Sequence, residues 1–263
     1  MKVSLITVSF NSAKTIAATI DSVLAQRGVD LEYIVIDGAS TDGTWGIVVE
    51  RLSKVSADGP VCHYRSESDD GMYDALNKGL AMATGDIVGI LNADDVFEDE
   101  YTLASIVSAF DVCTDAVYAD IRFVRGGRTV RYYSARHWKP WMHHWGYMPP
   151  HPSVYIRREQ FRRLGGYRTD YRISADFELM VRYFCKAAIN LKYLPRTVVR
   201  MTPGGISTSG WRALVTLNRE NVRANRENGY HSCFVMMLPK YFYKVLGMIR
   251  REVKARKSDE RAI

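Results

Sequence analysis

The sequence has few cysteines and no long apolar run. Its 263 residues include 4 Cys, which are far apart and form no Cys-x-x-Cys pair, so neither a disulfide framework nor a zinc site is expected. No segment approaches the roughly 20 apolar residues that cross a bilayer. Residues 1–6 begin directly in a strand-like pattern, so no secretory signal is expected. The remaining composition, 47% hydrophobic and 25% charged, excludes a disordered or collagen-like chain.

Charge is distributed unevenly along the chain. Residues 1–120 contain 7 Lys and Arg against 20 Asp and Glu, whereas residues 121–239 contain 21 against 6. An acidic half joined to a basic half indicates a site that uses carboxylates to hold a cation and cations to hold an anion. Nucleic acid is not expected as a partner, because the chain has no zinc-finger spacing and no RNA-recognition signature.

Strand and helix signals alternate through residues 1–120. Short β-branched apolar runs predict strands that are buried on both faces, and the segments between them carry apolar side chains at helical spacing. The expected strands are 3–8, 33–36, 62–66, 87–91 and 116–119, and the expected helices are 12–26, 44–55, 70–83 and 101–110. Repeated βα units of this kind predict an α/β fold, with a mostly parallel sheet covered by helices on both faces.

The second half of the chain is less regular. It predicts a hairpin of strands 121–124 and 129–133, an aromatic loop over 136–152, strands at 154–157 and 191–200, and helices at 176–186, 211–228 and 239–257. We therefore expect a catalytic domain over 1–210, with a nucleotide-binding half 1–120 and an acceptor-side half 121–210, followed by C-terminal helices over 211–263. The basic, aromatic tail fits an anionic membrane surface and a helix packed on the domain equally well.

Polar clusters follow three of the expected strands. They are residues 9–11, 37–43 and 92–95. Ligands of an open parallel sheet bind beyond the carboxyl ends of its strands, so these clusters are expected at one edge. Each cluster alone is also typical of turns and helix caps. Their shared position favours a binding site.

The cluster at 92–95 predicts a metal site. The neighbouring carboxylates of Asp94 and Asp95 repel each other unless a cation lies between them. Oxygen ligands of this kind suit Mg²⁺ or Mn²⁺, which complete their coordination with water and substrate phosphates. The alternative is a solvated loop that leads into the acidic residues 98–100, which favour the start of a helix.

Several ordered motifs resemble family 2 glycosyltransferases of the GT-A fold. The resemblance is strong over about the first 120 residues and is closest to enzymes that assemble bacterial exopolysaccharides, including colanic-acid-type enzymes. It rests on residues 5–11, 36–44, 66–79, 83–95 and 174–179.

The resemblance implies a nucleotide site. Phe10 matches the aromatic residue that stacks on the nucleobase, with Thr7 as a backbone contact, and Asp37 matches the carboxylate that accepts a hydrogen bond from uracil N3–H. Asn92 would face the donor ribose within the family's metal-binding Asp-x-Asp element, of which Asp94 would be the metal ligand. This chain has Asn rather than Asp at position 92. The other expected nucleotide-site residues are Asn11, Asp42, Lys78 and Ala93, and Asp95 would be an alternative or outer metal ligand.

Asp176 occupies the position of the family's catalytic base. One carboxylate suffices for an inverting displacement, in which it takes the proton of an acceptor hydroxyl. Asp176 also begins an expected helix, so a capping role remains open. Glu178 is the next candidate base, and His151 is a candidate contact near the donor.

The sequence therefore predicts an inverting glycosyltransferase that uses a nucleotide sugar, with a UDP-sugar favoured, and Mn²⁺ or Mg²⁺. The expected acceptor is a glycan or lipid-linked hydroxyl in surface polysaccharide synthesis, and the expected location is cytoplasmic, with attachment to the inner membrane face left open. Two alternatives remain. A nucleotidyltransferase lacks support because no Gly-rich basic loop follows the first strand. A non-catalytic nucleotide-sugar or glycan-binding module is favoured only by Asn92.

Overall fold

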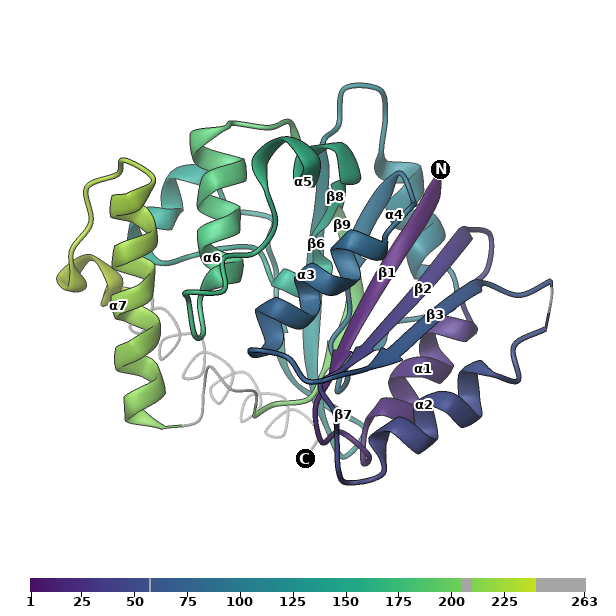
Figure 1. The fold of residues 1–263 in the computed structure, drawn as a ribbon. Coiled ribbons are helices and arrows are strands. Elements are labelled where there is room, and N and C mark those ends of the chain that lie inside the picture. Colours follow the sequence, from purple (N-terminus) through teal and green to yellow (C-terminus); the bar gives the residue numbers. More distant parts are fainter. Residues whose placement is uncertain (57, 205–209, 240–263) are drawn as a thin grey trace, which may run out of the picture.

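The computed structural model describes residues 1–56, 58–204 and 210–239. Within them, nine strands form one sheet in the order β3-β2-β1-β4-β8-β6-β9-β5, with β7 paired to β6 (Figure 1). The strands are β1 Lys2–Ser9, β2 Asp30–Asp37, β3 Val61–Ser66, β4 Ile87–Ile90, β5 Val96–Phe97, β6 Ala116–Arg125, β7 Arg128–Tyr133, β8 Tyr155–Arg157 and β9 Leu191–Met201. The first four neighbours are parallel, whereas β8 runs antiparallel between β4 and β6. The expected α/β class is confirmed.

Helices cover both faces of this sheet. Strands β1 and β2 point alternate side chains into two cores: Leu5 and Val35 pack with α1, α2 and α4, whereas Ile6 and Ile34 pack with α3, α5 and α6. The helices are α1 Ile16–Leu24, α2 Thr44–Leu52, α3 Met72–Met82, α4 Thr102–Ala109, α5 Arg158–Leu164, α6 Ala175–Met180 and α7 Trp211–Glu227. Burial on both faces explains why the strands are apolar at nearly every position.

Short helical turns complete the second half. They are the 3₁₀ turns η1 Pro140–Trp145, η2 His151–Ser153 and η5 Phe234–Met237, and the π-helical segment η3 Val181–Lys186, which continues α6. No helix in the described part of the chain has both the length and the apolar character that crossing a membrane requires. The expected helix at 239–257, and with it the membrane-surface interpretation of the tail, lies almost wholly outside the described residues, since 240–263 are not among them.

Several elements differ from the sequence-based expectation. The expected strands 116–119 and 121–124 form one strand, β6, across Asp120. This carboxylate is buried and accepts hydrogen bonds from Ala135 N at 2.7 Å and from Tyr193 Oη at 2.9 Å, so its polarity does not interrupt the strand. Strand β5 and helix α5 were not expected, because neither is long enough to give a periodic signal.

Candidate active site

Loops that follow β1, β2 and β3 meet at the carboxyl edge of the parallel strands. Figure 1 shows the chain that leaves β3 passing across this edge before it enters α3. Backbone hydrogen bonds connect the loops, from Gly38 N to Ser9 O at 2.8 Å and from Glu67 N to Asp37 O at 3.0 Å. The expected convergence of the clusters at 9–11 and 37–43 is therefore present, and the loop after β3 joins them.

Asp37 lies at the centre of this junction and is fully buried. Its Oδ1 accepts hydrogen bonds from Ser9 Oγ at 2.9 Å and Ser40 Oγ at 2.6 Å. Its Oδ2 accepts from Ser40 N at 2.9 Å and Ser66 Oγ at 2.7 Å. Two carboxylate oxygens offer about four acceptor sites, so this side chain has its capacity filled by the three loops.

Asp42 and Asn11 fasten the same loops a few residues farther on. Asp42 Oδ2 accepts from Ala13 N at 3.0 Å, and its Oδ1 accepts from Thr44 N at 3.1 Å at the start of α2. These hydrogen bonds lower the pKa of Asp42, and the one from Thr44 Oγ1 is the largest cause. Asn11 adopts a positive φ of 49° and accepts from Thr41 N at 3.0 Å. In this structure both side chains position the loops.

Phe10 and Thr7 differ in what they can offer a ligand. The Phe10 side chain is 65% exposed at the end of β1, although it is a large aromatic ring. Thr7 is fully buried, and its Oγ1 accepts a hydrogen bond from Tyr33 Oη at 3.1 Å. An exposed aromatic ring at the sheet edge can stack on a planar ligand, whereas Thr7 can offer only its backbone.

The fourth loop, residues 92–95, follows β4 directly beside the end of β1, because Leu91 N donates to Ile6 O at 3.0 Å. Asn92 Nδ2 donates to Asp95 Oδ2 at 3.0 Å, and Ala93 is buried. Asp95 is fully buried, and burial, followed by the charge of Asp94, raises its pKa well above the usual range. Asp94 reaches the surface at the rim, where partial loss of hydration raises its pKa as well.

Asp95 has one oxygen that is buried without any hydrogen-bond partner in the described part of the chain, namely Oδ1. A buried carboxylate oxygen in this state is costly unless a proton or a cation satisfies it. Across residues 1–56, 58–204 and 210–239, no group of three or more His, Cys, Asp and Glu could hold a metal. The unpartnered Oδ1 of Asp95 and the exposed carboxylate of Asp94 are oxygen ligands of the kind that a divalent cation takes together with water and substrate.

Asp176 lies in the first turn of α6, one position after its first residue. Its Oδ1 accepts hydrogen bonds from Phe177 N at 2.8 Å and Tyr73 Oη at 3.4 Å. No residue in the described ranges donates to its Oδ2. Burial raises the pKa of Asp176 to about 6 despite these hydrogen bonds. The N-cap residue of α6 is Ser174, which makes no side-chain cap hydrogen bond, whereas Asp176 satisfies the Phe177 N–H in the first turn, so Asp176 can stabilise the start of α6 and still offer its Oδ2.

The segment before Asp176 is held by helix α7. Glu220 accepts hydrogen bonds from the backbone N–H groups of Arg172, Ile173 and Ser174 at 2.8, 2.9 and 2.8 Å. Tyr73 at the start of α3 donates to Ile173 O at 2.5 Å. The position of Asp176 therefore depends on a helix from the segment that the sequence assigns to a C-terminal appendage.

His151 does not contact Asp176 directly. It is connected to Tyr73, the neighbour of Asp176, through Tyr167. Its Nε2 is 2.7 Å from Tyr167 Oη, and the Tyr167 ring stacks on Tyr73 with centroids 5.9 Å apart. Burial lowers the pKa of His151 to about 4, so the imidazole is neutral at neutral pH. This geometry supports a role in packing Tyr73 and Tyr167.

Glu178 and Lys78 are engaged in ion pairs. Glu178 is 2% exposed and pairs with Arg182 at 2.9 Å, so it has no access to a substrate hydroxyl. Lys78 pairs with Asp74 at 3.2 Å and Glu67 at 3.3 Å, and it donates to Ser68 O at 2.9 Å. Lys78 thus fastens the loop after β3, and its charge is already neutralised.

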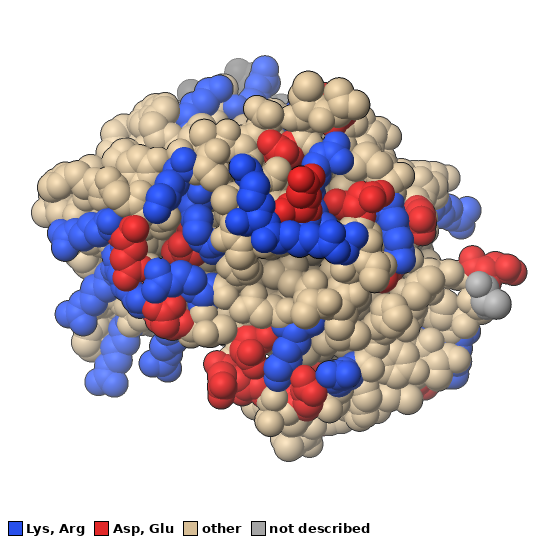
Figure 2. All heavy atoms as spheres, turned by 45° about the horizontal axis from the view of Figure 1, so that its top comes forward, with Lys and Arg blue, Asp and Glu red and all other residues tan. Residues whose placement is uncertain are grey.

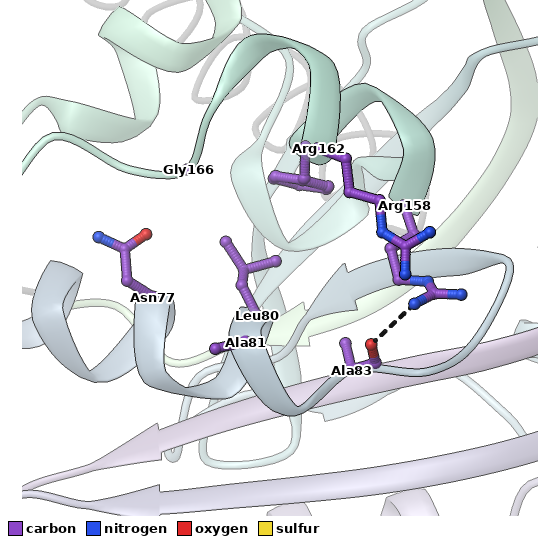
Figure 3. A pocket seen from close by; sticks show the side chains of 8 residues that line it. Asn77, Leu80, Ala81, Ala83, Arg158, Arg162 and Gly166 are labelled. Atoms are coloured by element: carbon purple, nitrogen blue, oxygen red, sulfur yellow. Dashed lines mark hydrogen bonds between the residues drawn. The ribbon is translucent and has the colours of Figure 1, made fainter.

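Two cavities flank helix α3. One, of about 280 Å³, is lined by residues 70–73 and 169–172 and adjoins Tyr73, so it opens beside the Asp176 segment. The other, of about 320 Å³, lies between α3 and α5 (Figure 3). None of the expected site residues lines this second cavity, whose lining is Asn77, Leu80, Ala81, Ala83, Arg158, Phe161, Arg162 and Gly166.

The charge imbalance of the sequence has a structural use besides ligand binding. Basic residues of the second half pair with acidic residues of the first half, as in Arg122 with Glu98 at 2.6 Å and Arg196 with Asp99 at 2.6 Å. Figure 2 shows Lys and Arg interspersed with Asp and Glu on the face that it presents. Part of this charge therefore forms ion pairs between the two halves of the chain. Each exposed pair stabilises the fold by about 0–1 kcal/mol.

Sequence reasoning missed two residues at the site: Tyr73 and Glu220. Tyr73 lies in the quoted motif 66–79, which gave it no role because its contacts are with the distant Ile173 and Asp176. Glu220 lies in an amphipathic helix with many charged residues, and nothing in its spacing distinguishes it.

Comparison with known proteins agrees with this arrangement. Residues 4–194 match the family described as Glycosyl transferase family 2. A "PGL/p-HBAD biosynthesis glycosyltransferase" of Mycobacterium tuberculosis is 29% identical over 216 residues, which are 78% of this chain and 79% of the relative. An uncharacterized glycosyltransferase of the same species is 32% identical over 202 residues, or 68% of each chain.

Solved structures share the fold at low sequence identity. A mannosyltransferase of Pyrobaculum calidifontis, in complex with GDP-Man and Mn²⁺, has a TM-score of 0.60 at 22% identity, over 84% of this chain and 64% of that structure. S. aureus TarS 1-349 in complex with UDP-GlcNAc has a TM-score of 0.66 at 19% identity, over 85% of this chain and 66% of that one. This chain thus spans about two thirds of either structure. The expected GT-A fold is confirmed, and the family match decides against a nucleotidyltransferase and a non-catalytic module: the chain belongs to glycosyl transferase family 2 and is a glycosyltransferase.

Proposed function

We propose that this chain transfers a sugar from a nucleotide-sugar donor, with a UDP-sugar favoured, to an acceptor hydroxyl and inverts the anomeric carbon. The observation that carries the proposal is the state of Asp176. Its Oδ1 accepts a hydrogen bond from Phe177 N at 2.8 Å, its Oδ2 receives no hydrogen bond from the described residues, and burial raises its pKa to about 6. A carboxylate of this kind is ionised near neutral pH and is basic enough to take a proton.

The chemistry assigned to Asp176 is a single displacement. The acceptor oxygen forms a bond to the anomeric carbon while the bond from that carbon to the diphosphate oxygen breaks. Asp176 Oδ2 takes the proton of the acceptor hydroxyl, and the nucleoside diphosphate leaves on the opposite face of the sugar. Phe177 N orients the Asp176 carboxylate, and Tyr73 holds the backbone before it by donating its hydroxyl proton to Ile173 O at 2.5 Å.

Asp94 and Asp95 are the residues that would hold a divalent cation, with Mn²⁺ and Mg²⁺ as candidates. The unpartnered Oδ1 of Asp95 supports this assignment. When bound, the ion supplies Lewis-acid stabilisation of the departing diphosphate. Asn92 belongs to the same loop and keeps Asp95 in place by donating a hydrogen bond from its Nδ2 to Asp95 Oδ2.

The acceptor proposed for this chain is a glycan or lipid-linked hydroxyl in surface polysaccharide synthesis, reached from the cytoplasm. The cavity lined by residues 70–73 and 169–172 supports an acceptor path, because it adjoins Tyr73 next to Asp176. Its lining includes the exposed polar side chains of Asp70, Thr169 and Arg172, which can form hydrogen bonds with the hydroxyl groups of a sugar.

A thermal-shift screen with UDP-, GDP- and dTDP-sugars, with and without Mn²⁺, tests this proposal. We expect a rise in the melting temperature with a UDP-sugar that is larger when Mn²⁺ is present, since ligands that bind only the folded state stabilise it. Release of the nucleoside diphosphate in the presence of candidate acceptors then tests transfer. If no nucleotide sugar raises the melting temperature, the assignment of a nucleotide-sugar donor is wrong.

A further inference from the structure

The cavity between α3 and α5 lies apart from the candidate active site. Ala83 and Arg158 line it, and Arg158 N donates to the backbone oxygen of Asp86 at 2.9 Å, directly before β4 begins. The cavity is therefore near the amino end of β4, whereas the loop 92–95 follows the carboxyl end. The four residues of β4 place about 13 Å of strand between them.

A contact between α3 and the loop after α5 separates this cavity from the one beside Asp176. Asn77 Nδ2 donates to Tyr167 O at 2.7 Å, and Asn77 Oδ1 accepts from Tyr167 N at 2.8 Å. Gly166 permits this close approach, because a Cβ at that position would lie 2.4 Å from Asn77 Oδ1. The other cavity, lined by residues 70–73 and 169–172, is on the far side of this contact along both segments. The cavity between α3 and α5 is thus a binding space of its own.

Two guanidinium groups line this cavity without a counter-charge. Arg158 and Arg162 lie one turn apart on α5, and Figure 3 shows both guanidinium groups at the end of the cavity next to Ala83. Within residues 1–56, 58–204 and 210–239, the Arg158 side chain makes one long hydrogen bond, to Ala83 O at 3.3 Å, and the Arg162 side chain makes none. Glu159 on the same helix pairs with neither of them in those ranges. Like charges at this spacing repel each other, so an anion between them would be stabilising.

The arginines on either side of this pair are used by the protein itself. Arg157 donates to two backbone carbonyl oxygens, each at 2.7 Å. Arg163 donates from Nη2 and Nε to Gln160 Oε1 at 2.6 and 3.0 Å. Arg158 and Arg162 therefore differ from their neighbours in having most of their donors unused.

The rest of the cavity wall is largely apolar. Leu80 and Ala81 of α3 face Phe161 of α5, whose ring is 9% exposed and belongs to the core. A volume of about 320 Å³ is in the range of small-molecule sites and exceeds the space that a single phosphate group needs. Guanidinium groups match the oxygens of a phosphate, and the apolar wall matches carbon atoms attached to it.

We propose that this cavity binds a phosphate group that is joined to an apolar body. Arg158 and Arg162 hold the phosphate oxygens, and the apolar wall contacts the carbon part. A phospholipid headgroup and a soluble phosphate ester share this chemistry. The site goes beyond the proposed sugar transfer, since none of its residues belongs to the candidate active site.

Calorimetry of the full chain with octyl phosphate and with inorganic phosphate tests the site. We expect octyl phosphate to bind at least about tenfold more tightly, because only octyl phosphate has an apolar part to bury. Arg158→Gln and Arg162→Gln should each weaken its binding about fivefold or more, since a charge-assisted hydrogen bond is lost. Arg163→Gln is the matched control, because it removes the same charge from the same helix outside the cavity lining. Ala81→Phe should also weaken binding, by filling the apolar part without changing the charge.

Flotation with phosphatidylcholine vesicles, with and without phosphatidic acid, distinguishes the two sources. Vesicle binding that requires phosphatidic acid and decreases in Arg162→Gln would assign the site to a lipid headgroup. Binding of octyl phosphate with vesicle binding unchanged by Arg162→Gln would assign the site to a soluble phosphate ester.

Octyl phosphate affinity that is unchanged in folded Arg158→Gln and Arg162→Gln proteins would overturn the proposal. An equal loss in Arg163→Gln, equally tight binding of inorganic phosphate, or no binding of either octyl phosphate or acidic vesicles would overturn it as well. Competition between octyl phosphate and UDP with Mn²⁺ would place the anion at the donor site and also contradict it. Failure of UDP to bind, with octyl phosphate bound as expected, would count against the proposed sugar transfer alone.

Discussion

The carboxyl edge of strands β1 to β3 and the Asp176 segment are stabilised in different ways. At the carboxyl edge, Asp37 is buried and accepts hydrogen bonds from neutral Ser groups at the ends of neighbouring parallel strands. The segment before Asp176 is held instead by Glu220, which lies more than forty residues later in α7. The first arrangement is local to the sheet, and the second depends on the end of the described chain.

The carboxylates of the two regions fall into two groups: those that position the backbone, and those that retain an oxygen for a proton, a cation or a ligand. Asp37 and Glu220 accept several hydrogen bonds and position backbone, so they have little capacity left for a ligand. Asp95 and Asp176 each retain an oxygen without a donor among the described residues, and burial raises the pKa of both. Raised pKa values of this kind are typical of functional sites.

Asp176→Asn should give the largest effect. We expect transfer to fall about 10²- to 10⁴-fold with donor affinity retained, because the amide cannot take a proton. Wild-type kcat/KM should rise with pH up to about 6 and then level. Transfer assays at several pH values measure the rate, and calorimetry measures the affinity for the donor. Near-normal turnover of the variant would remove Asp176 from the mechanism.

The same substitution should make the fold more stable at pH 7. A carboxyl whose pKa is raised on folding binds more protons in the folded state, so its contribution to stability decreases as pH rises from about 4 to 6. The variant avoids this cost, which we place at roughly 1–3 kcal/mol. Glu178→Gln is the contrasting control, because it breaks the buried pair with Arg182 and should lower stability.

Asp95→Asn should weaken Mn²⁺-dependent UDP binding at least about tenfold, since it removes a buried charged oxygen from the cation site. In the wild type, Mn²⁺ binding should strengthen with pH, because a carboxyl with a raised pKa must lose its proton to bind metal. Calorimetry at several pH values measures both effects. Equal Mn²⁺ enhancement in the variant and the wild type would contradict the metal assignment.

Asp37→Asn should lower the free energy of unfolding by about 1–3 kcal/mol, because an NH₂ group would face Ser donors that need an acceptor. Ser66→Ala removes one of these hydrogen bonds and should cost less. Urea denaturation measures the two changes. A variant as stable as the wild type would show that the three loops do not depend on Asp37.

Glu220→Gln should have the smallest effect, a decrease in kcat of about two- to tenfold at unchanged donor affinity. Burial is the main cause of the raised pKa of Asp176, and the charge of Glu220 adds to it. The inflection of the pH profile should therefore move to lower pH in the variant. Glu227→Gln, on the same helix but paired with Arg223, should leave the inflection in place.

Much of the fold follows from local patterns. The apolar runs around Ile6, Ile34 and Val88 predict strands buried on both faces, and the structure confirms them. Strand β5 and helix α5 were not predicted, since their short lengths give no periodicity and their stability comes from packing. The joining of the two expected strands into β6 was not predicted, because the buried Asp120 at their junction is satisfied by a partner as distant as Tyr193.

The candidate site was predictable by position but not by role. Polar residues at strand ends located Asp37, Asp94 and Asp95, and the family resemblance located Asp176. Their hydrogen-bond partners decide what each can do, and those partners come from distant segments, such as Ser66 for Asp37 and Tyr73 for Asp176. No spacing rule contains that information.

The sequence by itself determined the alternation of strands and helices, the edge at which polar loops gather and the family of the chain. Only the tertiary structure decided that Asp37 is saturated by Ser9, Ser40 and Ser66, and that Glu178 is neutralised by Arg182 while Asp176 retains an oxygen without a donor among the described residues. The physical reason is that secondary structure follows from residues close in the chain. The reactivity of a carboxylate follows from which donors surround it in space.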